Sequence, residues 1–551
     1  MQKPSASVHR QILQLTLPSV ATNLTVPLLG IADTTIVGHM GRAEYIAAIA
    51  VCTTLFNMIY WVFAFLRMGT TGLVAQAWGK GETTRAHTIL SQALVLGNTL
   101  GILIVLAQTL IFEGACHFMH ITEHLKEHVL AYAQIGVWGA PAMLSQYALT
   151  GWFIGQQNTR IPMCVAISQN ILNILLSTFL IFGMGLKMEG VALGTVISQY
   201  CGCLLAAWLA LKGGWHFNHQ PQVLKEGLLE FFHVNRDIFL RTLCLVAVTV
   251  FFTRAGNTQG ELVLSANTLL MQFFILYSYF TDGWANAAEA LAGRYASAHQ
   301  QRELRTTIVA LFWQVGLFSA IFTFLYIVTG PSIISLFTNL ESVLSTARTY
   351  LPWVWCIPLC AFVAMVWDGV FIGLTLTRGM LLSMFTSMLL FFVLYLTTKD
   401  HLHNHALWLA FLCYLVCRGA VQTIYFRKLK KKSDYSDYSE PNPLNYELPR
   451  HSHWFMHLSH HWTFSPPRHQ SRISLGQEVL VAFSAGGHRL PPGQPSLHKQ
   501  RSKHSHGRSG LLLVLEHRRS QSTTQPRKEG VVSHEPKAKE GLRIERLTLS
   551  V

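Results

Sequence analysis

The stretch Gly151-Trp-Phe-Ile-Gly-Gln-Gln-Asn-Thr-Arg160 returns 218 positions later in the chain as Gly369-Val-Phe-Ile-Gly-Leu-Thr-Leu-Thr-Arg378. A nearly equal offset of 217 aligns residues 75–78 with residues 292–295. An offset that is kept over separate segments indicates an internal repeat. The two halves of the chain are therefore expected to share one architecture.

Composition places this repeat in a membrane. Hydrophobic residues make up 51% of the chain and charged residues only 13%, about half the charged share of soluble proteins. Apolar runs long enough to cross about 30 Å of hydrocarbon lie at 12–37, 46–66, 88–111, 130–155, 161–182, 190–211, 239–255, 262–285, 307–329, 350–372, 379–397 and 405–426. The sequence thus predicts an all-α polytopic membrane protein with twelve transmembrane helices, and it excludes collagen-like and disulfide-rich secreted proteins.

The repeat also predicts how the helices are grouped. Six spans lie between equivalent positions, so both halves cross the membrane in the same direction and are related by a pseudo-two-fold axis along its normal. We expect an N-lobe of helices 1–6 (1–211), a cytoplasmic inter-lobe linker (212–238) and a C-lobe of helices 7–12 (239–433). Two six-helix lobes suit alternating access better than a channel, which would need a ring around a filter.

Loop charges predict the orientation. With the N-terminus in the cytoplasm, the inner segments carry thirteen Lys and Arg residues and the outer segments six, which favours cytoplasmic N- and C-termini. The last span is followed by a basic cluster at 427–432. Residues 434–551 then change to a polar, His-rich tail, with 12 histidines in the last 101 residues, and this composition predicts disorder.

Among the ionisable residues within the predicted spans, Asp33 is the one best placed for a role in transport. A carboxylate inside a span costs about 3 kcal/mol or more, so its presence needs a reason. Asp33 follows Pro18 and Pro27 in the first span, and each proline frees a backbone carbonyl and allows the helix to bend. Such a carboxyl could bind a proton or a cation and couple that event to helix shape. It could equally be a helix-end Asp at the outer interface.

Other spans carry polar side chains at helical spacing. In the first half these are Asn170, Asn173 and Ser177 of the fifth span and Thr195 of the sixth. They could supply oxygen ligands or act as interhelical hydrogen bonds. In the second half they are Asp282 and Glu289 on one face of the eighth span and Asp368 in the tenth. Gate positions and a direct role in transport are both consistent with these acids.

Sequence motifs of enzymes are missing from the chain. It has no phosphate-binding loop that ends in Gly-Lys-Ser/Thr, so ATP hydrolysis is not expected to drive it. No clustered nucleophile and no metal-ligand motif stands out either. We expect neither an enzyme nor a metal or organic cofactor.

Five motifs together resemble the multidrug and toxic compound extrusion (MATE) transporters, particularly the DinF-type branch. They agree in order and spacing with that family over residues 10–430. The motifs are Asn23-Leu-Thr-Val-Pro-Leu-Leu-Gly-Ile-Ala-Asp-Thr-Thr-Ile-Val-Gly-His39, Phe65-Leu-Arg-Met-Gly-Thr-Thr-Gly-Leu-Val-Ala-Gln76, Asn170-Ile-Leu-Asn173, Asp368-Gly-Val-Phe-Ile-Gly373 and Asn404-His-Ala-Leu-Trp-Leu-Ala410.

The resemblance implies a monomeric antiporter of the bacterial inner membrane. It would export organic cations, drugs or other amphipathic compounds in exchange for inward H⁺ or Na⁺, in contact with membrane lipids and without nucleic acid. A lipid-linked sugar or lipid flippase is the alternative, although related flippases carry more cationic residues in the central cavity.

The resemblance also implies roles for residues. Asp33 would be the coupling residue, with Asn173, Ser177 and Thr195 beside it, while Asn23, Asn170 and the proline bend belong to the same motifs. Many relatives have Asp where this chain has Ser177. With Asp33 as the remaining acid of that site, H⁺ is favoured over Na⁺ as the coupling ion.

Overall fold

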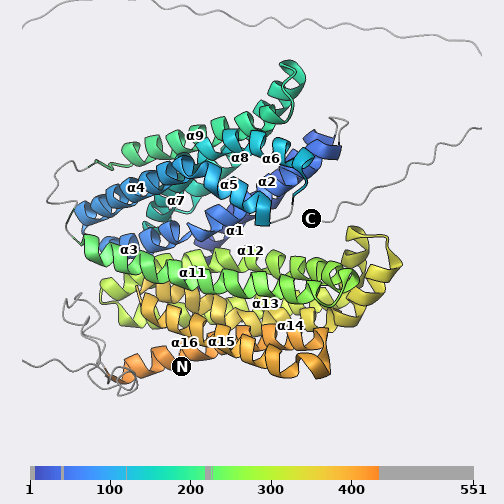
Figure 1. Ribbon diagram of the computed structural model, residues 1–551. Helices are drawn as coiled ribbons and strands as arrows, with labels where there is room; N and C mark the ends of the chain where they lie inside the picture. The colour runs from blue at the N-terminus through green and yellow to red at the C-terminus, as the bar shows by residue number, and fades with distance from the viewer. Residues whose placement is uncertain (1–5, 39–42, 119–120, 218–224, 226, 433–551) are drawn as a thin grey trace, which may run out of the picture. The chain divides into compact units, whose positions relative to one another are not determined.

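The computed structural model describes residues 6–38, 43–118, 121–217, 225 and 227–432, and all regular elements in these ranges are helices (Figure 1). The described residues belong to one compact unit. The predicted tail, 434–551, lies outside the described residues. The first half holds α1 (Ala6–Gly38), α2 (Ala43–Val62), α3 (Phe65–Lys80), α4 (Thr83–Leu106), α5 (Gln108–Phe118), α6 (Glu123–Gly136), the 3₁₀ turn η1 (Val137–Gly139), α7 (Ala140–Gly155), α8 (Arg160–Thr178), the π-turn η2 (Phe179–Gly183) and α9 (Met188–Lys212).

The second half has longer, simpler helices. They are α11 (Leu228–Asn257), α12 (Glu261–Ser297), α13 (Gln301–Phe337), α14 (Glu341–Gly373), α15 (Thr377–Leu402) and α16 (Asn404–Lys432). Together the described residues provide eleven segments long and apolar enough to cross a membrane. The remaining predicted span, 130–155, falls on α6, η1 and α7, which follow one another without a loop and are divided by the 3₁₀ turn just before Pro141. The protein is an all-α polytopic membrane protein, as predicted.

α11 begins earlier than the apolar pattern suggested. Residues 228–238, placed in the linker from the sequence, are helical. Phe231, Val234 and Ile238 recur at helical spacing on a buried face, which also holds the polar Asn235. Arg85 of α4 also reaches this region, with Nη2 3.5 Å from the Glu230 carboxylate. The start of α11 is thus packed against the first half.

The internal repeat is visible in the backbone of the connecting turns. Residues with positive φ occur in three pairs with equal spacing: Gly81 and His299, Gln157 and Thr375, Gly185 and His403. Each pair follows equivalent helices of the two halves and is separated by 218 residues. The offset of 217 for residues 75–78 was wrong: it rested on matching Trp78 to Tyr295, whereas the turns that follow these helices set the register at 218.

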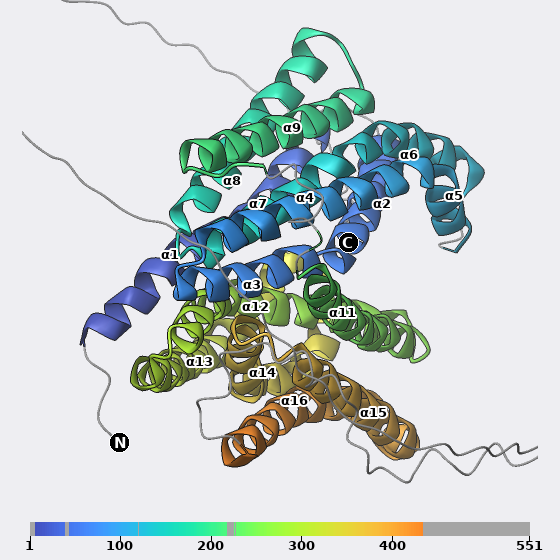
Figure 2. The same cartoon turned by 90° about the vertical axis from the view of Figure 1, so that its left-hand side faces the viewer.

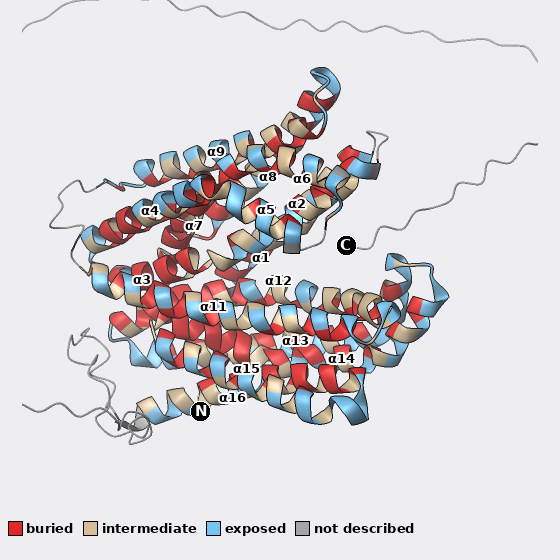
Figure 3. Ribbon diagram, in the orientation of Figure 1, coloured by how far each residue is buried: buried red, intermediate tan, exposed pale blue. Residues whose placement is uncertain are grey.

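The helices gather in two groups that follow the repeat. Figures 1 and 2 show α1–α9 together and α11–α16 together, with α1, α3 and α12 at the boundary. Buried residues are concentrated along α3, α7 and α14 and on the α3-facing part of α12 (Figure 3). One hydrophobic core includes residues of both groups, among them Leu66 and Leu291. The boundary between the halves is therefore part of the packed core.

Candidate functional site

Asp33 lies in the part of α1 that is less buried. Ile12 and Leu15, in the first third of the helix, are buried, whereas Val26 and Ile31 are 54% and 64% exposed. The helix continues through both Pro18 and Pro27. α1 thus has a first part held in the core and a second part, carrying Asp33, that has fewer neighbours.

Two asparagine side chains hold α1 just before Pro27. The Asn170 side chain of α8 donates to the Thr25 carbonyl at 3.3 Å. From α1 itself, Asn23 donates to the Tyr279 carbonyl of α12 at 3.0 Å. One turn of α1 is thereby attached to both halves, directly before the proline that interrupts its hydrogen bonding. The hydrogen bonds of Asn23 and Asn170 therefore lie at the turn of α1 before Pro27.

The structure places Asn173 of α8 beside Thr195 of α9. The Asn173 amide donates to Thr195 Oγ1 at 3.1 Å and to Ser198 Oγ at 3.4 Å. Tyr132 of α6 lies near this group, close to Thr195 and to Asp33. Tyr132 is buried among helices α2, α6 and α9. Together these side chains connect α1, α6, α8 and α9.

Among the described residues, the buried oxygen atoms that have no hydrogen-bond partner include Asp33 Oδ1, Asn173 Oδ1 and Ser177 Oγ. Buried polar atoms are rarely left without a partner in a folded protein. Ser177 is also packed tightly against α9, where a Cβ placed on Gly194 would come 2.6 Å from Ser177 Oγ. The π-turn η2 begins two residues after Ser177, and such turns recur at functional sites.

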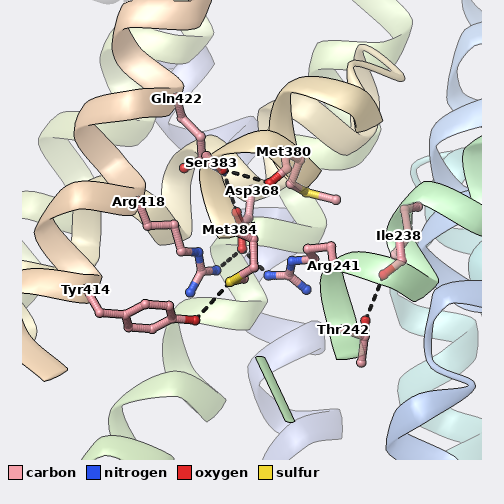
Figure 4. A network of polar contacts seen from close by, with 10 residues as sticks. All are labelled: Ile238, Arg241, Thr242, Asp368, Met380, Ser383, Met384, Tyr414, Arg418 and Gln422. Carbon is pink, nitrogen blue, oxygen red and sulfur yellow. Dashed lines mark hydrogen bonds and ion pairs between the residues drawn. The ribbon is translucent and has the colours of Figure 1, made fainter. Parts of the chain in front are cut away.

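Asp368 lies in a different environment, deep in the C-lobe (Figure 4). Its carboxylate forms ion pairs with Arg241 of α11 and Arg418 of α16. It also accepts a hydrogen bond from Gln422 Nε2 at 2.7 Å. Asp368 and Arg418 are both buried. Two guanidinium groups therefore pair with this one carboxylate, and the ion pairs connect helices α11, α14 and α16 of the C-lobe.

Glu289 and Asp282 share one face of α12 but differ in their surroundings. Arg67 of α3 donates from Nη1 to Asn286 Oδ1 at 2.9 Å and to Glu289 Oε2 at 3.2 Å. Glu289 is thus a buried partner in an ion pair between the halves. Asp282, by contrast, is exposed. Charged groups within its electrostatic reach are Arg67, Arg241, Asp368 and Arg418, which come from four other helices.

Several of these partners were missed from the sequence. Arg67 stood inside a quoted motif without being assigned a role, and Arg241, near the start of the predicted span 239–255, was assigned none either. The cation Arg418 within the last span was a usable signal, since a charge inside a span needs a partner. Tyr132 and Ser198 gave no signal, because aromatic and hydroxyl residues are common in membrane helices.

Comparison with known proteins identifies the family. A protein-family model described as MatE matches residues 18–179 and 238–397, more than half of the chain. The chain belongs to the MATE family. MATE proteins are multidrug and toxic compound efflux transporters, so this chain is an integral membrane efflux transporter. The two matched segments fall in the two halves of the repeat.

Curated relatives support this MATE assignment. The chain is 33% identical to DNA damage-inducible protein F of Escherichia coli over 439 residues, covering 77% of this chain and 93% of that protein. It is 26% identical to the chloroplastic Protein DETOXIFICATION 44 of Arabidopsis thaliana, covering 68% and 74%. The bacterial match agrees with the DinF-type motifs.

Solved structures show the same fold. The Vibrio cholerae MATE transporter VcmN in its bent form superposes with a TM-score of 0.73 at 18% identity, covering 79% of this chain and 99% of that one. A MATE transporter in an outward-facing conformation superposes with a TM-score of 0.69 at 18% identity, covering 78% and 99%. The MATE fold thus accounts for nearly the whole described part of the chain.

Proposed function

We propose that this MATE protein is a cation-coupled antiporter that exports organic cations or other amphipathic compounds by alternating access. The observation that carries the proposal is the Asp33 carboxylate, placed beyond Pro27 in the less buried part of α1. Because Asn23 and Asn170 hold the turn before Pro27, a change of charge at Asp33 acts on a segment that can move relative to a fixed point.

We favour H⁺ over Na⁺ as the coupling ion. Na⁺ needs several oxygen ligands and a compensating charge, and Ser177 stands where many relatives have a second acid. A single carboxylate with amide and hydroxyl neighbours is sufficient for a proton. In this proposal Asp33 is ionised in one state and protonated in the other, and the change releases substrate from the N-lobe.

Asp282 supports an organic cation as substrate. Its side chain is exposed although it lies in the middle of α12, and the charged groups around it include Arg67 of the first half. An accessible carboxylate there can attract a positively charged group. The flippase alternative needs free cationic groups in the same region. Arg241 and Arg418 instead share the Asp368 carboxylate, and Arg67 is paired with Glu289.

We further propose that the protein is a monomer in the bacterial inner membrane with both termini in the cytoplasm. The turns after α3, α7, α12 and α14 then face the cytoplasm. Basic residues at this end of the helices include Lys80, Arg160, Arg302, Arg305 and Arg378, as the positive-inside rule requires.

The deciding experiment uses the full chain in liposomes with an encapsulated cationic dye. Efflux is driven by a pH gradient or by a Na⁺ gradient, for the parent, for Asp33→Asn and for Asp400→Asn, an exposed acid at the far end of α15. We expect the pH gradient alone to drive the parent and Asp400→Asn, and Asp33→Asn to be inactive. Unchanged gradient-driven efflux by Asp33→Asn would refute the role of Asp33, and a requirement for Na⁺ would refute the choice of ion.

A further inference from the structure

Two polar contacts join the halves at the end of the bundle where α3 and α12 end. Gln76 of α3 donates from Nε2 to Thr375 Oγ1 at 3.0 Å and to the Gly373 carbonyl at 3.1 Å. Arg294 of α12 donates from Nη1 to Gln157 Oε1 at 2.6 Å. In each contact a helix of one half reaches the turn that follows a helix of the other half.

These two contacts are copies of one interaction. Gln76 and Arg294 are equivalent residues of the repeat, and so are their acceptors Gln157 and Thr375, since 218 positions separate the members of each pair. The pseudo-two-fold operation exchanges the halves, so it converts the first contact into the second. This is the isologous arrangement found in symmetric dimers, here between the two halves of one chain.

The residues between the two contacts lie at the pseudo-two-fold axis. A Cβ placed on Gly293 would come 2.6 Å from the Cβ of Ala75, its own counterpart in the repeat. A Cβ on Gly79 would likewise collide with Ser297, which is again its counterpart. α3 and α12 therefore cross at matching small residues with no space between them. The polar contacts flank this crossing, one on each side.

The Thr375 backbone supplies an independent observation. Thr375 has φ 52°, a left-handed conformation that is costly for a β-branched residue. Gly is the residue that adopts it without strain. Threonine at this position makes the turn less stable than glycine would, but its hydroxyl accepts the hydrogen bond from Gln76. Backbone strain of this kind is typical of gates and switch regions.

We propose that Gln76 and Arg294 are paired gate residues, which hold this end of the boundary between the halves closed and must both release before the site can open there. The inference rests on the alternating access proposed above, but not on the identity of the ion or the substrate. Because each contact crosses the boundary, neither can persist when α3 and α12 separate. Because the contacts are symmetric, separation breaks both.

The two contacts are expected to be of similar strength. Arg294 donates one hydrogen bond that carries a formal charge, whereas Gln76 donates two neutral hydrogen bonds, and charge-assisted hydrogen bonds are roughly twice as strong. Removing either side chain should shift the closed–open equilibrium about tenfold, and removing both should shift it further.

The test measures the gate directly. Spin labels are placed at Glu82 and Gln300, exposed counterparts in the turns after α3 and α12, in a chain whose ten cysteines have been replaced. Distance distributions are recorded in liposomes for the parent, Gln76→Ala, Arg294→Ala and the double variant. We expect the fraction with a long label distance to rise in both single variants and to rise furthest in the double variant. The matched control is Trp78→Ala, a change on an exposed face of α3.

A conservative substitution at Arg294 distinguishes loss of the hydrogen bond from a general loss of packing. Arg294→Gln puts the side chain of Gln76 at the equivalent position, so it should restore a largely closed distribution where Arg294→Ala does not. Equal distributions for the parent and the double variant would overturn the proposal, as would an identical response to Arg294→Gln and Arg294→Ala. Dye efflux is measured for the same variants. If efflux is absent in the parent and in every variant while the label distances shift as expected, the proposed antiport is wrong but the assignment of Gln76 and Arg294 as gate residues is supported.

Discussion

Ala75 and Gly293 occupy the same position in the two halves of the repeat and meet each other where α3 crosses α12. A Cβ on Gly293 would come 2.6 Å from the Cβ of Ala75 and 2.9 Å from the Gly373 carbonyl. The contact between a residue and its own counterpart marks the pseudo-two-fold axis. It also explains why the halves can approach so closely at this end, since only small side chains stand at the crossing.

Gly293→Val tests this close packing. The added atoms collide with backbone as well as with Ala75, and overpacking of this kind costs about 1–3 kcal/mol. We expect a lower midpoint of thermal unfolding in detergent, measured by fluorescence-detected gel filtration. Gly114→Val is the control, because a Cβ on Gly114 of α5 meets nothing within 4 Å. Equal midpoints for the two variants would contradict the crossing described here.

The sequence predicted the membrane fold and the repeat because both leave periodic signals. Apolar runs of span length and a recurring decapeptide are readable without contacts. The hydrogen-bond and ion-pair partners of a side chain leave no such periodic signal. Nothing in the sequence around Asp368 shows that Arg241 and Arg418, 127 and 50 positions away, will share its carboxylate.

The same limit applies to the N-lobe group. Asn173 and Thr195 were found because a family motif pointed to them, whereas Tyr132 was not found. Its hydroxyl becomes relevant only when α6 packs against α2 and α9. The exact register of the repeat also needed the structure, since side-chain likeness suggested 217 and the left-handed turns give 218.

Tyr132→Phe should weaken transport and leave the fold intact. The change removes the Tyr132 hydroxyl, a polar group near Thr195 and Asp33. A single polar contact of this kind contributes about 0.5–1.5 kcal/mol, so we expect a loss of initial efflux rate of roughly two- to tenfold. Tyr395→Phe in the C-lobe core is the control. A parental rate in Tyr132→Phe would remove this residue from the site.

Asp368→Asn should destabilise the C-lobe strongly. The variant leaves Arg241 and Arg418 buried with less compensating charge, and breaking a buried ion pair from one side costs about 3–5 kcal/mol. We expect poor yields of folded protein in detergent. Asp368→Asn combined with Arg418→Met removes one of the two cations and should recover part of the yield. If the single variant folds as well as the parent, the cluster is not structural.

Asp282→Asn should affect binding of charged substrates selectively. The side chain is accessible at the boundary between the halves, so losing its charge weakens attraction for a cation and leaves apolar contacts unchanged. We expect KM for a cationic dye to rise about tenfold, as for one charge-assisted hydrogen bond, and KM for an uncharged amphipathic dye to change little. Glu303→Gln, an exposed acid at the start of α13, is the control. Equal changes for both dyes would exclude direct recognition of charge by Asp282.

Asn170→Ala should uncouple the bend of α1 from the N-lobe. Asn170 holds the Thr25 carbonyl, and Asn23, two residues before Thr25, holds α12, so the turn before Pro27 is fixed from both sides. Without Asn170, protonation of Asp33 would move the whole outer part of α1 rather than bend it at Pro27. We therefore expect dye binding to persist while the number of dye molecules exported per proton falls, measured as efflux against proton uptake in the same vesicles. Asn98→Ala removes a comparable contact within the N-lobe, to Ser145, and should leave this ratio unchanged. A parental ratio in Asn170→Ala would show that the bend does not depend on this hydrogen bond.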